Sequence, residues 1–151
     1  MSRTRIVVAD QAEAVFYDTA APTQPPREVA RIADTAAHLH DREFSSDRPG
    51  RGHAKARGTR HAFGGENDPR HREAVGFARH IANQLEEARQ RDEFDDLVVV
   101  AGPAFLGLVR QEMSKPTRAR VVHEVHKDLV HSPVEELRQH LAELAEEPSL
   151  A

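Results

Sequence analysis

The sequence predicts an α/β domain with a mixed sheet of about five strands and helices on its faces, in the order βββ-loop-αβαβα. Three observations support this. Short apolar runs typical of strands lie near the N-terminus, residues 35–65 show no sustained hydrophobic period, and amphipathic helices alternate with apolar strands after residue 68. Alternating strands and helices form parallel pairs, so we expect the second half of the sheet to be parallel and the first half antiparallel. The 151 residues are expected to form a single domain.

The first half of the chain is predicted to supply the antiparallel strands. Residues 6–9 and 14–17 are apolar runs separated by Asp10-Gln11, which indicates a hairpin. Three prolines make residues 20–26 a linker, because proline lacks an amide donor and fixes its backbone angle. Residues 27–34 then mix apolar and charged side chains, which predicts a weak third strand.

The second half begins with a predicted helix that runs to about Arg91. Asp68 can cap its start and Pro69 suits its first turn. Apolar residues recur at spacings of four and three and give one buried stripe. The stripe consists of Ala74, Ala78, Ile81, Leu85 and Ala88.

A strand and a second helix follow. The unbroken apolar run 97–101 predicts a strand buried on both faces. Gly102-Pro103 turns the chain into a helix, which Lys115-Pro116 stops. Its inward residues are expected to be Phe105, Leu108 and Val109.

The chain ends in a predicted strand and a predicted helix. Val121, Val122 and Val125 indicate the last strand, and Ser132-Pro133 with Glu135 resembles a capping box at the start of the final helix. The buried stripe of that helix is expected to be Val134, Leu137, Leu141 and Leu144.

Composition excludes several classes of site. With no cysteine, the chain has no disulfide framework, no thiol nucleophile and no Cys-ligated metal. Its apolar runs are far shorter than the roughly 20 residues that span a bilayer, and its N-terminus lacks a signal-peptide pattern. We expect a cytoplasmic protein with no membrane partner.

Residues 48–61, RPGRGHAKARGTRH, are the most unusual stretch. They hold five Arg or Lys and two His with no acidic residue, and removing these five charges from the formal net charge of -4 leaves the rest of the chain at -9. Such a concentration of cations indicates a polyanion partner, and spaced cations can follow an RNA backbone without reading bases. The alternative is a solvated loop without a partner. We expect a basic, flexible loop at about residues 42–68.

A diglycine follows this stretch, at Gly64-Gly65, with Glu66 after it. Two glycines allow a backbone to approach a ligand closely, although they can equally form a hinge. The predicted RNA-binding residues are therefore Arg48, Arg51, His53, Lys55, Arg57, Arg60, His61, Gly64, Gly65 and Glu66.

Other candidate chemistry is weaker. His38 with His40 and His123 with His126 have spacings that could share a metal, but no third ligand is indicated, so we predict no metal and no cofactor. Gly102-Pro103 lies where α/β sheets place ligands but matches neither GxGxxG nor a P-loop. No nucleophile motif is present, and Asp10 is best interpreted as a turn residue.

Several segments together resemble a known family. They are IVVAD at 6–10, DRPGR at 47–51, FDDLVVVA at 94–101, PAFLGLV at 103–109 and VHKDL at 125–129. Jointly they resemble the bacterial family labelled "protein required for attachment to host cells". That family is in turn similar to the middle domain of archaeal and eukaryotic peptide-chain release factors and of ribosome-rescue factors.

The resemblance implies a release-factor middle-domain-like fold with Gly64-Gly65 in the position of a catalytic Gly-Gly-Gln loop. The third residue is Glu66 rather than Gln, so the resemblance leans away from an enzyme. We therefore expect a ribosome- or tRNA-associated factor, acting in hibernation, protection or rescue, with the ribosome, ribosomal RNA or tRNA as partner. One alternative is a host-attachment or surface interaction protein; the other is a peptidyl-tRNA hydrolase-like enzyme with Glu66 as base.

Overall fold

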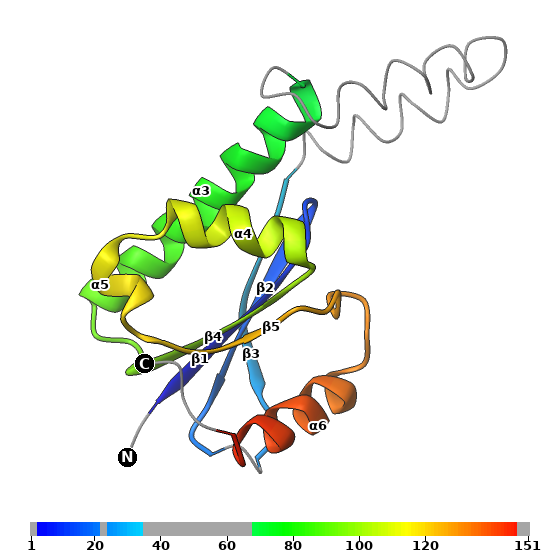
Figure 1. Cartoon of the computed structure of the whole chain (residues 1–151). Helices are drawn as coiled ribbons and strands as arrows, with labels where there is room; N and C mark the ends of the chain where they lie inside the picture. Colours follow the sequence, from blue (N-terminus) through cyan, green and yellow to red (C-terminus); the bar gives the residue numbers. More distant parts are fainter. Residues whose placement is uncertain (1–2, 22–23, 35–67, 148–151) are drawn as a thin grey trace, which may run out of the picture.

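A computed structural model describes residues 3–21, 24–34 and 68–147 (Figure 1). Its sheet has five strands in the order β3-β2-β1-β4-β5, which confirms the predicted mixed α/β architecture. The first three strands are antiparallel, whereas β4 pairs in parallel with β1 and with β5. The strands are β1 (Thr4–Ala9), β2 (Glu13–Thr19), β3 (Arg27–Ala33), β4 (Asp96–Ala101) and β5 (Val121–Val125).

Helices cover both faces of the sheet. In Figure 1, α3 and α4 lie on one face and α6 lies on the other. Each face has its own buried cluster, one built from α3, α4 and the sheet, the other from α6, the segment before it and the sheet. The helices are α3 (Pro69–Gln90), α4 (Pro103–Glu112), α5 (Lys115–Arg118) and α6 (Val134–Leu144).

The two central strands are buried on both faces, as the apolar run 97–101 predicts. Side chains alternate along a strand, so Val7 and Val99 face α3 and α4, whereas Ile6 and Val98 face α6. The sheet therefore places the carboxyl ends of β1 and β4 side by side at one edge of the core.

The long helix α3 follows the sequence prediction closely. The Asp68 side chain accepts a hydrogen bond of 3.0 Å from the Arg70 amide, and Pro69 occupies the first turn. All residues of the predicted stripe are buried, and so are Phe77 and Ala82, which the pattern did not include. Phe77 stacks on Phe105 of α4 with ring centroids 6.1 Å apart, which joins the two helices.

The connection after α4 differs from the prediction. The helix ends at Glu112, and Lys115-Pro116 begins a separate short helix, α5, instead of serving only as a stop. Ser114 caps it by accepting a hydrogen bond of 3.3 Å from the Thr117 amide. Proline suits such a first turn because the amide there has no helical partner.

A further correction concerns the inward face of α4. Leu106 is buried, whereas Leu108, which the sequence predicts to face inward, is only partly buried. Apolar character alone indicates that a side chain is buried, but the position of the neighbouring element decides which face of the helix is covered.

The predicted capping box of the last helix is wrong. The cap of α6 is Pro133, which has no side chain to accept the hydrogen bond, and Glu135 instead pairs with Arg138 one turn later. Val134 is 42% exposed, so the buried stripe begins at Leu137. Within the ranges that the structure describes, no helix is both long and apolar enough to cross a bilayer.

Candidate functional site

Residues 48–61, the cation-rich segment, belong to the stretch 35–67, whose flanking residues lie at the end of the sheet where β1 and β4 finish. On one side, Ala33 lies opposite Glu13 in the β2–β3 pair, and the Asp34 amide donates a hydrogen bond of 2.7 Å to the Ala12 carbonyl. On the other side, the chain resumes at Asp68, directly before α3. Both flanks of residues 35–67 therefore lie close to the turn between β1 and β2.

That turn is held by Asp10, as predicted. One Asp10 carboxylate oxygen accepts hydrogen bonds of 2.8 Å from the amides of Ala12 and Glu13. The Asp10 amide also donates to the Glu13 carbonyl at 2.9 Å. These bonds fix a tight turn and leave Gln11 exposed at its tip.

An ion pair and a nearby imidazole connect the turn to the segments beside it. Arg31 of β3 lies 3.2 Å from a Glu13 carboxylate oxygen. His131, which precedes α6, places its Nε2 3.5 Å from Glu13 and 3.8 Å from Asp10. The carboxylates of the turn are therefore engaged in contacts that hold the fold together.

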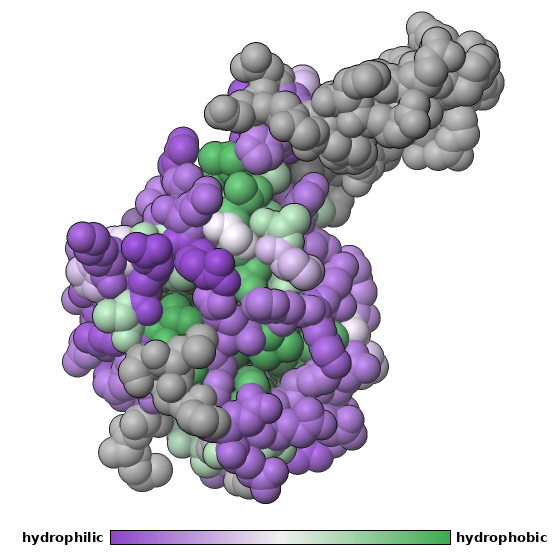
Figure 2. All heavy atoms as spheres, in the orientation of Figure 1, coloured by the Kyte–Doolittle hydropathy of each residue, from purple (hydrophilic) through white to green (hydrophobic). Residues whose placement is uncertain are grey.

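A pocket of about 320 Å³ opens between this turn, α3 and α4. Its apolar lining comes from Ala74 of α3 and from Phe105 and Leu108 of α4. Apolar atoms reach the surface between these two helices in Figure 2. The polar residues at the pocket are Gln11, Asp68, Arg70 and His71.

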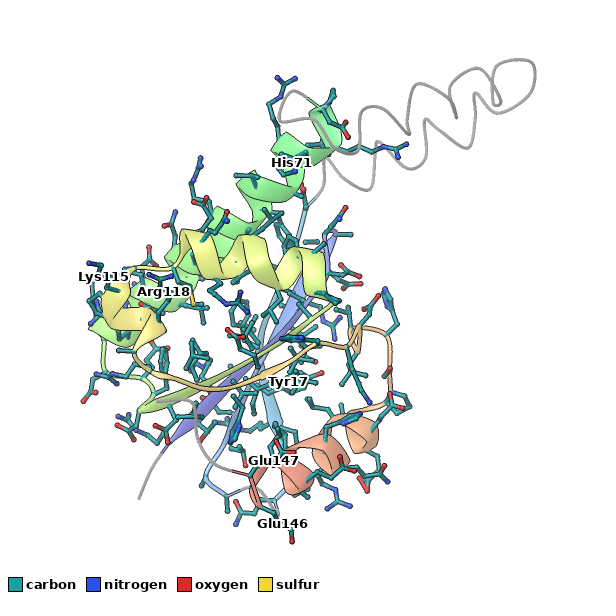
Figure 3. All side chains as sticks on the ribbon, in the orientation of Figure 1. Tyr17, His71, Lys115, Arg118, Glu146 and Glu147 are labelled. Carbon is teal, nitrogen blue, oxygen red and sulfur yellow. The ribbon has the colours of Figure 1, made fainter. Side chains whose placement is uncertain are left out.

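The opposite end of α3 carries a hydrogen-bonded cluster centred on Glu86. Its carboxylate accepts hydrogen bonds from Arg89 at 2.7 Å, from the Ser114 hydroxyl at 2.6 Å and from the Thr117 hydroxyl at 2.7 Å. These three donors, Arg89 foremost, lower the pKa of Glu86 from 4.5 to about 2. The cluster anchors α5, which exposes Lys115 and Arg118 to solvent (Figure 3).

A second charged pair joins α4 to the edge strand β5. Arg110 and Glu124 make two hydrogen bonds, of 3.0 and 2.6 Å. The hydrogen bond from Arg110 lowers the pKa of the Glu124 carboxyl below its ordinary value. This pair fixes α4 on the sheet, whereas the Glu86 cluster fixes α5 on α3.

All ten predicted RNA-binding residues lie outside the described residues, so their role stays a prediction. The same holds for His38 and His40. His123 lies on β5, and His126 follows that strand with its Nε2 3.9 Å from a Glu124 oxygen. Across residues 3–21, 24–34 and 68–147, no group of three or more potential ligands could hold a metal ion.

The pocket is the feature that the sequence pattern missed. Gly102-Pro103 marked the end of β4 as a place where ligands bind, but nothing in the sequence paired it with Gln11 or His71. These residues come from three separate segments and meet only when β1 and β4 pair in parallel. The strand order of the sheet brings these residues together, and no sequence motif indicates it.

Comparison with known families gives a match that covers most of the chain. The model of a family described as "protein required for attachment to host cells" matches residues 5–141. No curated protein matches the chain. The sequence resemblance to this family is thereby confirmed, while the further likeness to release factors stays a prediction. The chain belongs to the family described as "protein required for attachment to host cells".

Proposed function

We propose that the protein is an RNA-binding factor that associates with the ribosome or with tRNA through residues 48–61. The observation that carries this proposal is the charge of that segment, five cations without an acidic residue on a chain that is otherwise strongly acidic. Cations at this density bind phosphate backbones because they release condensed counterions. The family description leaves the partner of this segment open.

The position of the segment in the fold supports the proposal. The segment joins the domain at the start of α3, where Arg70, His71 and Arg72 follow within the first turns. At that point the sheet end, the turn between β1 and β2 and the pocket form one surface. A polyanion bound by residues 48–61 would therefore meet further cationic side chains on the domain itself.

The distribution of acidic residues also supports it. Residues 121–147 contain seven Asp or Glu and two Lys or Arg. Figure 3 shows Glu146 and Glu147 at the opposite end of the molecule from His71. Glu146 and Glu147 therefore lie away from the place where the segment joins the domain, so their charge would repel RNA bound there less than carboxylates beside it would.

The test is binding to purified ribosomes and to tRNA, by cosedimentation and by gel shift. The variant replaces Arg48, Arg51, Lys55, Arg57 and Arg60 with Ala. We expect it to lose binding at low salt, because the phosphate contacts have been removed. A matched variant changes only the four arginines of this set to lysine. It keeps the positive charge and should retain most of the binding.

Salt gives an independent readout. Five phosphate contacts predict a slope of about -3.5 in log K against log salt, which amounts to a roughly 100-fold loss between 50 and 200 mM. Absence of binding to both ribosomes and tRNA at low salt would refute the proposal. Equal binding by the wild type and the alanine variant would also refute it.

A second candidate, attachment to host cells, is favoured by the family description itself. It requires the protein to be exposed on the outside of the cell that makes it. Protease treatment of intact cells distinguishes the two functions. Degradation of the protein while internal proteins survive supports attachment, whereas full protection supports the RNA-binding function.

A further inference from the structure

The carboxyl ends of the parallel strands β1 and β4 lie side by side, and a pocket opens beside them. After β1 the chain makes the hairpin to β2, and after β4 it enters α4. The carboxyl ends of parallel strands are where α/β sheets commonly place ligands. The pocket of about 320 Å³ lies there, because Gln11 follows β1 and Ala104 follows β4.

The floor of this pocket is apolar and partly aromatic. Ala74 and Phe105 are almost fully buried, and Leu108 is partly buried beside them. The Phe105 ring stacks on Phe77 of α3, with ring centroids 6.1 Å apart. Such a surface receives a flat, largely apolar ring.

The rim offers hydrogen-bonding groups of both kinds. The Asp68 carboxylate lies at the rim, where its Oδ1 accepts a hydrogen bond of 3.0 Å from the Arg70 amide. Gln11 can donate and accept. Arg70 and His71 add a cationic side chain and an imidazole, which together suit a phosphate group.

Size limits the choice of ligand. Small-molecule sites range from about 300 to 1,000 Å³, and this pocket lies at the lower limit. It can therefore receive one nucleotide unit but not two. A nucleotide unit also carries the groups that the pocket complements: a flat ring for the floor, N–H or O–H donors for Asp68 and Gln11, and a phosphate for Arg70 and His71.

We propose that this pocket binds a single nucleotide unit, which is either one residue of an RNA chain or a free mononucleotide. The choice of a nucleotide over another small anion rests on the proposed function, because the pocket lies where the cation-rich segment joins the domain. The pocket would hold one residue of the RNA whose backbone the segment contacts.

The test uses full-length protein and four probes, AMP, GMP, CMP and UMP, with binding followed by NMR chemical-shift changes. Ala104→Trp fills the pocket from an exposed position on α4, so the core is not disturbed. Ala119→Trp is the matched control, because Ala119 is also exposed and lies outside the pocket, after α5. Circular dichroism checks that both variants fold.

We expect at least one mononucleotide to bind the wild type and Ala119→Trp equally, and Ala104→Trp at least tenfold more weakly. His71→Ala should weaken a nucleotide more than the matching nucleoside, since only the nucleotide carries the phosphate. Binding of a short RNA oligonucleotide distinguishes a residue of an RNA chain from a free mononucleotide as the ligand. Tighter binding of the oligonucleotide, weakened by Ala104→Trp, indicates an RNA residue, whereas binding of mononucleotides alone indicates a free ligand.

The proposal is overturned if none of the four mononucleotides and no oligonucleotide shows binding that Ala104→Trp weakens. Its failure can be told apart from failure of the proposed function. The variant with five alanines at residues 48–60 should still bind mononucleotides but should no longer bind ribosomes. If Ala104→Trp binds ribosomes as the wild type does and no mononucleotide binds either protein, the pocket proposal is refuted. The proposed function is then unaffected.

Discussion

Glu86 holds α5 against α3, and we expect Glu86→Gln to destabilise the fold. The carboxylate accepts hydrogen bonds from Arg89, Ser114 and Thr117 at 2.6 to 2.7 Å. The Thr117 side chain is fully buried, so its hydroxyl has no water as an alternative partner. A glutamine amide offers one acceptor oxygen, so it cannot replace all three contacts.

The size of the effect follows from the pKa. Lowering the pKa from 4.5 to about 2 corresponds to roughly 3 kcal/mol at 1.36 kcal/mol per pKa unit. That figure is a ceiling, because 29% of the Glu86 side chain is exposed and solvent screens its charge. We therefore expect a loss of about 2 kcal/mol at pH 7, which lowers Tm by roughly 4 to 8 °C in a domain of this size.

The dependence on pH has a definite sign. The unfolded carboxyl takes up its proton at a higher pH than the folded one, so the stabilisation is complete above about pH 4.5 and is lost as pH falls towards 2. Glu86→Gln cannot titrate, so the difference between wild type and variant should shrink over this window. Other carboxylates remain in both proteins and cancel in the comparison.

The assay is urea unfolding followed by circular dichroism at pH 7, 5 and 3.5. The matched control is Glu87→Gln, because Glu87 is the next residue on α3 and its Arg91 partner lies 4.0 Å away on the exposed surface. We expect the control to change stability by less than about 0.5 kcal/mol. Equal stability of Glu86→Gln and wild type at pH 7 would refute the role of the cluster, as would a difference that stays constant down to pH 3.5.

Two further predictions concern the core and the turn at the candidate site. Leu85→Ala removes a fully buried side chain from α3 and should cost about 2 to 5 kcal/mol in urea unfolding, whereas a change below 1 kcal/mol would contradict the assigned core. Asp10→Ala removes two hydrogen bonds of 2.8 Å to backbone amides and should cost about 1 to 2 kcal/mol. Asp10→Asn, which retains an acceptor oxygen, should recover most of that loss, and failure to recover would contradict the turn geometry.

Much of the fold could be predicted from the sequence because periodicity is a local signal. The stripe from Ala74 to Ala88 and the unbroken apolar run of β4 each identify an element and its buried face. The Asp68 cap was also predictable, since the capping side chain is adjacent to the amide that it accepts from. Alternation of these elements then predicted the parallel half of the sheet.

The remaining features depend on contacts between distant segments. Ser132 and Glu135 have the spacing of a capping box, but Glu135 pairs with Arg138 and the helix begins one residue later than a Ser132 cap requires. Val134 is apolar yet 42% exposed, so its apolar character alone does not predict burial. The pocket combines Gln11, His71 and Ala104, whose proximity follows only from strand order.

Residues 48–61 are proposed to bind RNA through phosphate contacts. The most direct measurement is the slope of log K against log salt for tRNA binding, determined for the wild type and for the variant with five alanines. We expect a slope of about -3.5 for the wild type and binding of the variant too weak to measure at 50 mM salt. Identical slopes for the two proteins, or no measurable affinity of the wild type at 50 mM salt, would contradict the proposal.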